Sequence, residues 1–499
     1  MTSILQWAVA RNGTPLARSD IPLLDGETFR DSIVDAVADD GKVAALFGHR
    51  TEGDASVDLY AVLACRDAAV LRVARTRVNG TGFPSLTPRC TQVHLFEREI
   101  AEGFDLIPEG HPWLKPVRFL RTGSSAPLIG VTNYYRVEGE EVHEVAVGPV
   151  HAGVIEPGHF RFQCHGEQVF HLEISLGYQH RGVERAIVSG LPLRAIHYME
   201  TLAGDTTIGH ATAYCQALEG LCGCAVPARA QILRGIALEL ERLANHTGDL
   251  GALAGDVGFL PTASYCGRLR GDFLNMTAIL CGNRFGRGLI RPGGVGYDLD
   301  AKSVSDLRDR LALALRDVGN AVQLLWNSPS VMSRFSETGR VSLETCRQLG
   351  MVGPAARASG MEADVRQDFP SGIFRFAQIP VSTGAEGDVF ERAHIRWMEI
   401  QRSGEFILEQ LKMLAEGSIR VDPASVAGDS LVVSLVEAWR GAVCHVGLTD
   451  SAGRWSAYKV VDPSFFNWTG LAMALRNQQI SDFPLCNKSF NLSYCGHDL

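Results

Sequence analysis

The sequence lacks any apolar stretch long enough to span a lipid bilayer, which takes about 18 consecutive apolar residues. The most apolar candidate, residues 431–446, is interrupted by Glu437 and Arg440. Residues 1–20 contain no basic segment followed by an apolar run, so we expect no secretory signal peptide there. Any association with a membrane is therefore expected to depend on partner proteins.

An excess of positive charge is also missing. The 47 Lys and Arg residues are outnumbered by 56 Asp and Glu residues, which gives a formal net charge of −9. Binding to a phosphate backbone needs concentrated Lys and Arg, whereas the basic residues here are dispersed apart from clusters such as residues 284–291. We therefore predict no nucleic-acid partner.

Cysteine pairs at metal-ligand spacing are scarce as well. The twelve cysteines are scattered along the chain, and Cys222-Gly-Cys224 does not have the spacing of a standard zinc pair. A chain of this length is also unlike a small secreted disulfide scaffold. We expect most of the cysteines to be reduced, buried and apolar in behaviour, which suits the cytoplasm.

What is present divides into two modules, and the expected fold class is α+β. Residues 1–127 predict a small α/β domain, with a helix at residues 93–103 and strands at residues 43–47, 57–63 and 69–75. Gly123–Pro127 has the composition of a linker. Residues 128–499 predict a larger, mainly helical domain with a peripheral β-sheet.

Three long segments of the second module have apolar residues at helical spacing: residues 232–243, 307–325 and about 388–415. Ser303 or Ser305 is the expected N-cap of the second of these helices. Near the end of the chain, a turn signal at residues 450–453 lies between two alternating runs, residues 442–448 and 455–461. This pattern predicts a β-hairpin.

Two segments of the first module carry a recognisable signature, Pro84-Ser-Leu-Thr-Pro-Arg89 and His94-Leu-Phe-Glu-Arg-Glu-Ile100. Together with Glu109-Gly-His-Pro112, they resemble the C subunit (30 kDa subunit) of complex I. Glu102-Gly-Phe-Asp105 departs from the Asp-Leu-Phe-Gly that is usual in that family. The module offers no nucleophile–base pair, so we expect its charged helix to be a docking surface.

Five motifs of the second module occur in a fixed order: Gly148-Pro-Val-His151, Ile155-Glu-Pro-Gly-His159, His180-Arg-Gly-Val-Glu184, Glu239-Leu-Glu-Arg-Leu-Ala-Asn-His246 and Arg291-Pro-Gly-Gly-Val295. They resemble the D subunit (49 kDa subunit) of complex I and the large subunit of group 4 nickel–iron hydrogenases, over nearly the whole module. Fusion of the two modules in one chain is itself a pattern of these enzymes. The resemblance implies a hydrogenase-large-subunit-like domain at residues 128–499.

The same resemblance shows what this chain lacks. The hydrogenases hold nickel and iron with two Cys-x-x-Cys pairs, and the matching positions here are Ala203, Thr206, Ser464 and Asn467. Alanine has no ligand atom, and neutral Ser, Thr and Asn side chains are poor ligands for a soft metal. We therefore expect no metal bound by this chain, which makes an active nickel–iron hydrogenase the least favoured of the functions considered.

A quinone site of the complex I kind has also changed. The family uses a His in the first β-turn and a Tyr on the following helix, and the matching positions here are Pro157 and Gly204. His151 and His159 lie on the same turn, so a quinone that binds to one of them is still an alternative.

In the relatives, several of these motifs converge on the cavity that holds the nickel–iron centre. The resemblance therefore implies that the polar residues of these motifs surround the corresponding place in this chain. Such residues can transfer protons when burial and neighbouring charges shift their pKa values. The alternative is that they form ion pairs which hold helices together. The candidates for proton transfer or a quinone cavity are Glu156, His159, Glu184 and His210, and the candidates for cavity lining are His151, Arg181, Asp205, Asp462 and Asn467.

The leading hypothesis from the resemblance is a subunit of a membrane-associated oxidoreductase complex that couples electron transfer to ion translocation. Its expected partners are a small iron–sulphur subunit that carries the cluster, a ferredoxin-like subunit and antiporter-like membrane subunits. It would then lie on the cytoplasmic face of the cell membrane. The alternative is a structural scaffold with a vestigial cavity. A pocket lined by Glu156, His159, His210 and Asn467 would favour chemistry, whereas dense packing would favour a scaffold.

The last 20 residues, 480–499, carry an apolar load of Phe, Leu and Tyr side chains. Burying even half of these side chains would contribute several kcal/mol, at roughly 1.5–3 kcal/mol each. We therefore predict that residues 468–499 stay attached and pack as an ordered extension.

Overall fold

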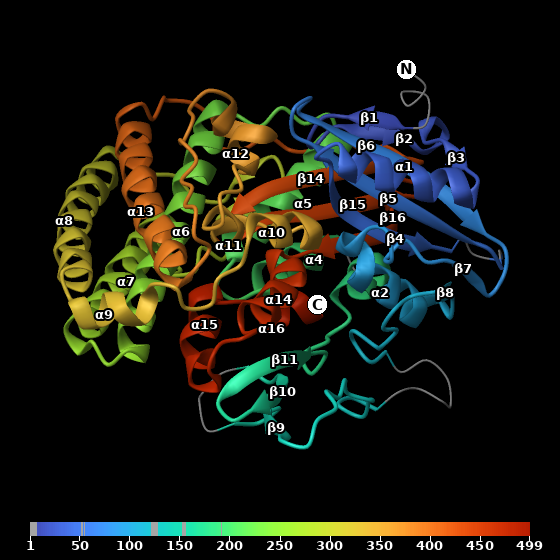
Figure 1. The fold of residues 1–499 in the computed structure, drawn as a ribbon. Helices are drawn as coiled ribbons and strands as arrows, with labels where there is room; N and C mark the ends of the chain where they lie inside the picture. The colour runs from blue at the N-terminus through green and yellow to red at the C-terminus, as the bar shows by residue number, and fades with distance from the viewer. Residues whose placement is uncertain (1–6, 51–52, 54, 121–127, 152–155, 191) are drawn as a thin grey trace.

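The computed structural model describes residues 7–499 apart from residues 51–52, 54, 121–127, 152–155 and 191. The predicted linker, Gly123–Pro127, lies outside the described residues. The fold is α+β, as the sequence predicts, with several antiparallel sheets and one large helical layer. Figure 1 shows the helical layer on one side of the molecule and the first module's sheet on the other.

The first module is built on a five-stranded sheet. The strands are β1 (Ala8–Ala10), β3 (Leu23–Leu24), β4 (Lys42–His49), β5 (Val57–Cys65) and β6 (Val70–Val78). The order is β1-β6-β5-β4, and β3 pairs with β6. Eight of the nine residues of β5 are buried, because its Val, Leu and Ala side chains lie between α1 (Gly26–Ala38) and the rest of the fold. The three predicted strands and the helix α2 (His94–Phe104) are confirmed.

A second sheet joins the two modules. Its order is β16-β15-β14-β2, so the short strand β2 (Pro15–Ala17) from the start of the chain pairs with β14 (Ser430–Ala438). The predicted hairpin is confirmed as β15 (Gly441–Thr449) and β16 (Trp455–Val461). One apolar core contains first-module residues together with three residues of β14, namely Leu431, Val433 and Leu435. The modules therefore share a core.

Four long helices form the layer that lies opposite the first module (Figure 1): α6 (Ala228–Asp256), α7 (Leu260–Cys281), α8 (Ala301–Trp326) and α13 (Val389–Lys412). All three predicted long helices are confirmed. The predicted N-cap of α8 is wrong, because Asp300 caps it and its carboxylate accepts the N–H of Ser303 at 2.7 Å. The helix α6 packs between α7 and α13, so even its charged residues are buried.

The remaining elements connect these layers. A three-stranded sheet contains β9 (Val142–Val147), β10 (His159–His165) and β11 (Gln168–Ser175), and two small pairs are β7 (Gly82–Pro84) with β8 (Ile107–Glu109) and β12 (Ile290–Arg291) with β13 (Gly294–Val295). The shorter helices are α3 (Val183–Ser189), α4 (Pro192–Leu202), α5 (Thr207–Leu221), α9 (Pro329–Phe335), α10 (Leu343–Leu349), α11 (Gly353–Arg357), α12 (Val365–Asp368), α14 (Pro463–Ala474), α15 (Phe483–Phe490) and α16 (Tyr494–Asp498). In the described part of the chain, no helix combines the length and apolarity required to cross a bilayer.

The end of the chain packs into the molecule. The helices α15 and α16 and their flanking residues bury a set of apolar side chains: Leu485, Cys486, Phe490, Leu492, Tyr494 and Leu499. Figure 1 shows both helices between the β9–β11 sheet and the core. The predicted packing of this extension is confirmed.

Candidate functional site

Two of the sequence candidates, His210 and Asp462, are hydrogen-bonded to each other. His210 lies in the first turn of α5, and Asp462 is the N-cap of α14, where its carboxylate accepts the N–H of Ser464 at 2.8 Å. Nε2 of His210 lies 3.1 Å from Oδ2 of Asp462, and both side chains are buried. Burial alone would raise the pKa of Asp462, but the hydrogen bond from His210 and the charge of Arg440 hold it below its ordinary value.

The hydrogen bonds continue beyond His210 through two residues that the motifs did not indicate. Nδ1 of His210 lies 3.1 Å from Nε2 of His445 on β15, and Nδ1 of His445 lies 2.9 Å from the hydroxyl of Tyr458 on β16. Burial lowers the pKa of His445 well below its ordinary value and raises the pKa of Tyr458. A single histidine inside the apolar run 442–448 was the only sequence signal for this pair.

One arrangement of protons satisfies every nitrogen and oxygen of this chain. An ionised Asp462 only accepts, so neutral His210 donates its Nε2–H to Asp462 and accepts at Nδ1. His445 then donates its Nε2–H to His210 and accepts the hydroxyl proton of Tyr458. All three hydrogen bonds therefore point toward Asp462. The three hydrogen bonds thus link four titratable side chains in series across the buried centre.

Asp205 lies next to this centre and pairs with Arg440 at the turn between β14 and β15. Two guanidinium nitrogens of Arg440 lie 2.6 Å from the two carboxylate oxygens of Asp205. The Nε–H of Arg440 donates to the backbone oxygen of Asn491 at 2.6 Å. This geometry is bidentate and partly buried, so the pair fixes the start of α5 against the second sheet.

Glu184 belongs to a different cluster. Its carboxylate accepts the N–H of Val460 at 2.9 Å and lies 3.2 Å from Nζ of Lys459, which also binds Glu99 of α2. Burial opposes ionisation of Glu184, yet Lys459 and Arg118 hold its pKa below the ordinary value. Because side chains alternate along β16, Lys459 and Tyr458 point to opposite faces of the strand. Glu184 is therefore separated from the His210 centre by the sheet.

Three further candidates make contacts with nearby backbone. Both terminal nitrogens of Arg181 donate to carbonyls, those of Thr201, Leu202 and Cys495. Nδ1 of His159 lies 3.2 Å from the carbonyl oxygen of Gly148. Asn467 accepts the N–H of Val352 and donates to its carbonyl, both at 3.0 Å. These contacts position loops and helix ends.

The segment that holds α16 packs against Glu156, Gly158 and Asp462. Glu156 accepts the N–H of Cys495 at 3.1 Å. The ring of Tyr494 packs so closely on Gly158 that a Cβ there would lie 2.7 Å from a ring carbon, and a Cβ on Gly496 would lie 2.7 Å from the Asp462 carboxylate carbon. His151 is half-buried, and its Nε2 has no hydrogen-bond partner among the described residues.

The structure has two large cavities elsewhere, of about 450 and 590 Å³. The residues that line them do not include Glu156, His159, His210 or Asn467. The roles assigned to these residues from sequence stay predictions.

Asp498 holds α16 in this place, so it provides a test of the packing. Its carboxylate accepts the N–H groups of Gly177 at 2.8 Å and Gln179 at 2.9 Å. We expect Asp498→Ala to destabilise this segment by about 1–3 kcal/mol, because the buried N–H of Gly177 and the partly buried N–H of Gln179 lose their acceptor. Hydrogen exchange of the 494–499 amides should become faster than in the wild type. Ser481→Ala, at an exposed site, is the matched control; equal exchange in both variants would contradict the assignment.

The positions that hold nickel and iron in the hydrogenases do not form a metal site here. Ala203 has no ligand atom, the Ser464 hydroxyl accepts the N–H of Ser493 at 2.9 Å, and both ends of the Asn467 amide are bound to Val352. Across the described ranges, no group of three or more His, Cys, Asp or Glu side chains is arranged to hold a metal ion. A nickel–iron centre does not fit these residues.

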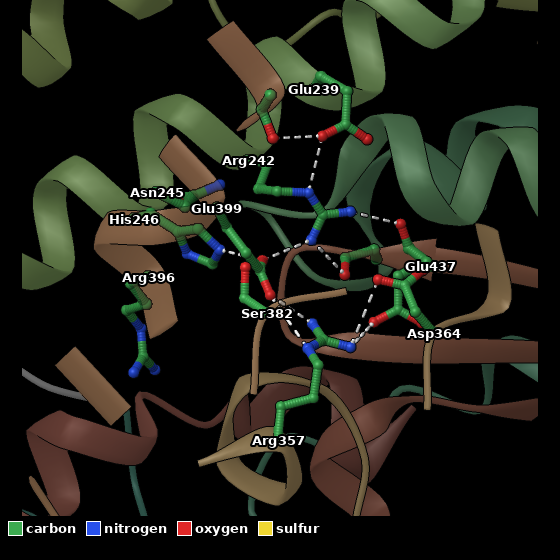
Figure 2. A network of polar contacts seen from close by, with 12 residues as sticks. Glu239, Arg242, Asn245, His246, Arg357, Asp364, Ser382, Arg396, Glu399 and Glu437 are labelled. Carbon is green, nitrogen blue, oxygen red and sulfur yellow. Dashed lines mark hydrogen bonds and ion pairs between the residues drawn. The ribbon is translucent and has the colours of Figure 1, made fainter. Parts of the chain in front are cut away.

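A second buried polar network surrounds the motif at residues 239–246 of α6 (Figure 2). Its centre is Arg357, which is fully buried and lies 2.7 Å from Glu399 and 2.8 Å from Glu437. Arg242 and His246 of α6 lie 3.4 and 2.8 Å from the other oxygen of Glu399. The network ties α6 and α13 to β14 and to the loop before α12.

The charges of this network are close to balance. Its arginines are Arg242, Arg357 and Arg366, and its carboxylates are Glu239, Asp364, Glu399 and Glu437. Arg357 and His246 hold the pKa of Glu399 well below its ordinary value against the effect of burial. Burial and the nearby Asp364 raise the pKa of Glu437 to about 7. Glu437 is therefore the carboxylate of this network that can carry a proton near neutral pH.

Comparison with known proteins gives one consistent family. The family of the 49 kDa subunit of the respiratory-chain NADH dehydrogenase matches residues 256–431. The carbon monoxide-induced hydrogenase of Rhodospirillum rubrum is 31% identical over 353 residues, which cover 70% of this chain and 97% of that protein. The chain belongs to this family.

Two further relatives show the breadth of the family. Formate hydrogenlyase subunit 5 of Escherichia coli is 29% identical over 83% of this chain and 77% of its own length. The NADH-quinone oxidoreductase D subunit of Carboxydothermus hydrogenoformans is 29% identical over 68% of this chain and 93% of its own length. The family member described here thus resembles hydrogenase and NADH dehydrogenase subunits alike.

Proposed function

We propose that this family member is a subunit of a membrane-associated oxidoreductase complex, in which the His210 centre changes its protonation when electrons reach an iron–sulphur partner. The relatives are named as subunits of NADH-quinone oxidoreductases and of hydrogenases, which supports an electron-transfer complex. The observation that carries the proposal is the buried chain from Tyr458 through His445 and His210 to Asp462. These four titratable groups lie in series, which is the arrangement that a proton relay requires.

The proposed partners are a small iron–sulphur subunit, a ferredoxin-like subunit and antiporter-like membrane subunits, which would place the chain on the cytoplasmic face of the membrane. Exposed apolar side chains between residues 128 and 150 support a surface for a partner. The exposed fractions of Leu128, Val131 and Val150 are 61, 67 and 91%. Exposed apolar side chains that gather in one segment are typical of interaction sites. In this assembly the complex would pass electrons to an acceptor such as a quinone and couple the reaction to ion movement.

A structural scaffold is the second candidate. The packing of α16 against Glu156, Gly158 and Asp462 favours it, because this space holds protein atoms. The two candidates differ in what the buried chain must do. A scaffold requires only that the four residues pack, whereas the proposed coupling requires that they exchange protons.

Tyr458→Phe in the assembled complex separates the two. The substitution removes only the hydroxyl at the end of the chain and keeps the ring. We expect complex assembly to be unchanged and turnover with the complex's electron donor to fall by about 10²-fold or more, the usual contribution of a proton-transfer group. Turnover and the rate of iron–sulphur reduction are measured with NADH, formate, hydrogen or a quinol as donor.

Tyr297→Phe is the matched control, since Tyr297 is 48% exposed and lies on the surface. A Tyr458→Phe complex that turns over as fast as the control would favour the scaffold.

A further inference from the structure

The largest cavity described above, of about 590 Å³, lies between the two modules and is separate from the His210 centre. Its walls come from β4 and β5 of the first module and from β14, β15, α10 and α14 of the second. A volume of this size falls within the range of small-molecule sites. Its position in a shared core means that an occupant would contact both modules.

The apolar part of the wall comes from two aromatic rings and several aliphatic side chains: Phe369, Phe466, Met351, Met361, Val365 and Leu435. Two methionines next to two aromatic rings form an adaptable apolar surface. These walls suit a ligand with a flat or branched apolar body.

The acidic side chains on the wall already accept hydrogen bonds, including the exposed Glu344, which accepts from the Gln348 amide at 2.7 Å. Both oxygens of Glu437 accept hydrogen bonds, from Arg357 at 2.8 Å and from the N–H of Val365 at 3.0 Å. Both oxygens of Asp364 bind Arg366. Asp40 pairs with Arg66 at the rim. Asp368 accepts the N–H of Asp364 at 3.0 Å, and burial raises its pKa to about 6.

Lys42 is different. It lies on the edge strand β4 and lines the cavity, and its Nζ is 3.5 Å from the centre of the Phe466 ring. No carboxylate in the described part of the chain lies within 4.0 Å of that nitrogen. Burial lowers the pKa of Lys42 to about 7, although Cys444 and Glu437 act in the opposite direction. An anionic partner in the cavity would remove this penalty.

We propose that this cavity binds a small organic monoanion, with its carboxylate on Lys42 and its apolar body between Phe369 and Phe466. A cation is disfavoured, because Glu437 and Asp364 on the inner wall are bound to arginines behind them. The site does not depend on the proposed coupling function.

Benzoate is a suitable probe, with benzamide and benzylamine as its neutral and cationic counterparts. Binding to the purified full chain with its partner subunits is measured by saturation-transfer NMR and calorimetry. We expect benzoate to bind at least ten-fold more tightly than either counterpart. Lys42→Met should weaken benzoate by at least ten-fold, whereas Lys302→Met, at an exposed site on α8, should leave it unchanged.

A second variant guards against misfolding. Ala442→Phe places a ring in the cavity while keeping Lys42, and it should abolish benzoate binding with the thermal midpoint of unfolding close to that of the wild type. The proposal is overturned if benzoate fails to bind, if benzylamine binds as well as benzoate, or if folded Lys42→Met retains full affinity.

Discussion

Replacing Arg357 with methionine is expected to lower the free energy of unfolding by about 3–5 kcal/mol, the cost of removing one partner from a buried ion pair. Arg357 is fully buried, and its guanidinium lies within 2.8 Å of both Glu399 and Glu437. Without it, these two carboxylates, each only 2% exposed, lose their nearest positive charge. Several kcal/mol is a large share of the stability of a typical domain.

The measurement is chemical unfolding of the purified chain, followed by circular dichroism. Arg340→Met is the matched control, because Arg340 pairs with Glu386 at the surface and both side chains are about half exposed. We expect the control to change stability by less than about 0.5 kcal/mol, since exposed ion pairs contribute little. Equal effects of the two substitutions would contradict the structural role given to the network.

A second substitution tests the mechanism behind this loss. Glu437 is the network carboxylate whose pKa is raised to about 7. Adding Glu437→Gln to Arg357→Met removes one uncompensated charge, so we expect the double variant to recover part of the lost stability. Contacting residues show such coupling, with interaction energies of about 0.5–3 kcal/mol.

Much of the fold could be predicted from the sequence, because its signals are local. The strands β4 to β6 and the hairpin of β15 and β16 follow from alternating apolar residues and a turn at residues 450–453. The prediction of the N-cap of α8 was wrong by a few residues. Ser303, Ser305 and Asp300 are all good N-cap residues, and the sequence alone does not rank them.

The polar interior was much harder to predict. The motif of α6 drew attention to Glu239, Arg242 and His246, but their charged partners Arg366 and Glu399 lie far along the chain. No local pattern predicts which distant charges will meet. His445 and Tyr458 were missed for the same reason, because neither belongs to a motif and only the hairpin register and α5 bring them to His210. The candidate list therefore contained half of the hydrogen-bonded chain.

The family resemblance drew attention to the region around Asp462, but it did not predict which residues pack there. The segment of α16 packs against Glu156, Gly158 and Asp462, three positions of the family motifs or next to them. This segment is apolar enough to be predicted as packed, yet nothing in its sequence showed that it packs against Glu156 and Asp462. The contact depends on two glycines, Gly158 and Gly496, that allow close approach.

The pH dependence of stability should change when Glu241 is replaced by glutamine. Glu241 lies on α6, and its carboxylate accepts the N–H groups of Ile208 and Gly209 at 2.7 and 3.2 Å, in the first turn of α5. Burial raises its pKa to about 8, although these two hydrogen bonds act in the opposite direction. At neutral pH the folded protein therefore keeps a proton on Glu241 that the unfolded chain, with an ordinary pKa near 4.5, has released.

Because the folded state binds the extra proton, the contribution of Glu241 to stability is complete below about pH 4.5 and is lost as the pH rises toward 8. Glutamine carries no charge at any pH and can still accept a hydrogen bond. We expect the stability of Glu241→Gln, relative to the wild type, to rise by on the order of 1.4 kcal/mol per pH unit between about pH 5 and pH 8. Glu405→Gln, at an exposed position on α13, should instead run parallel to the wild type. A constant difference between Glu241→Gln and the wild type would mean that Glu241 is ionised in the folded protein, and that the two N–H groups of α5 outweigh its burial.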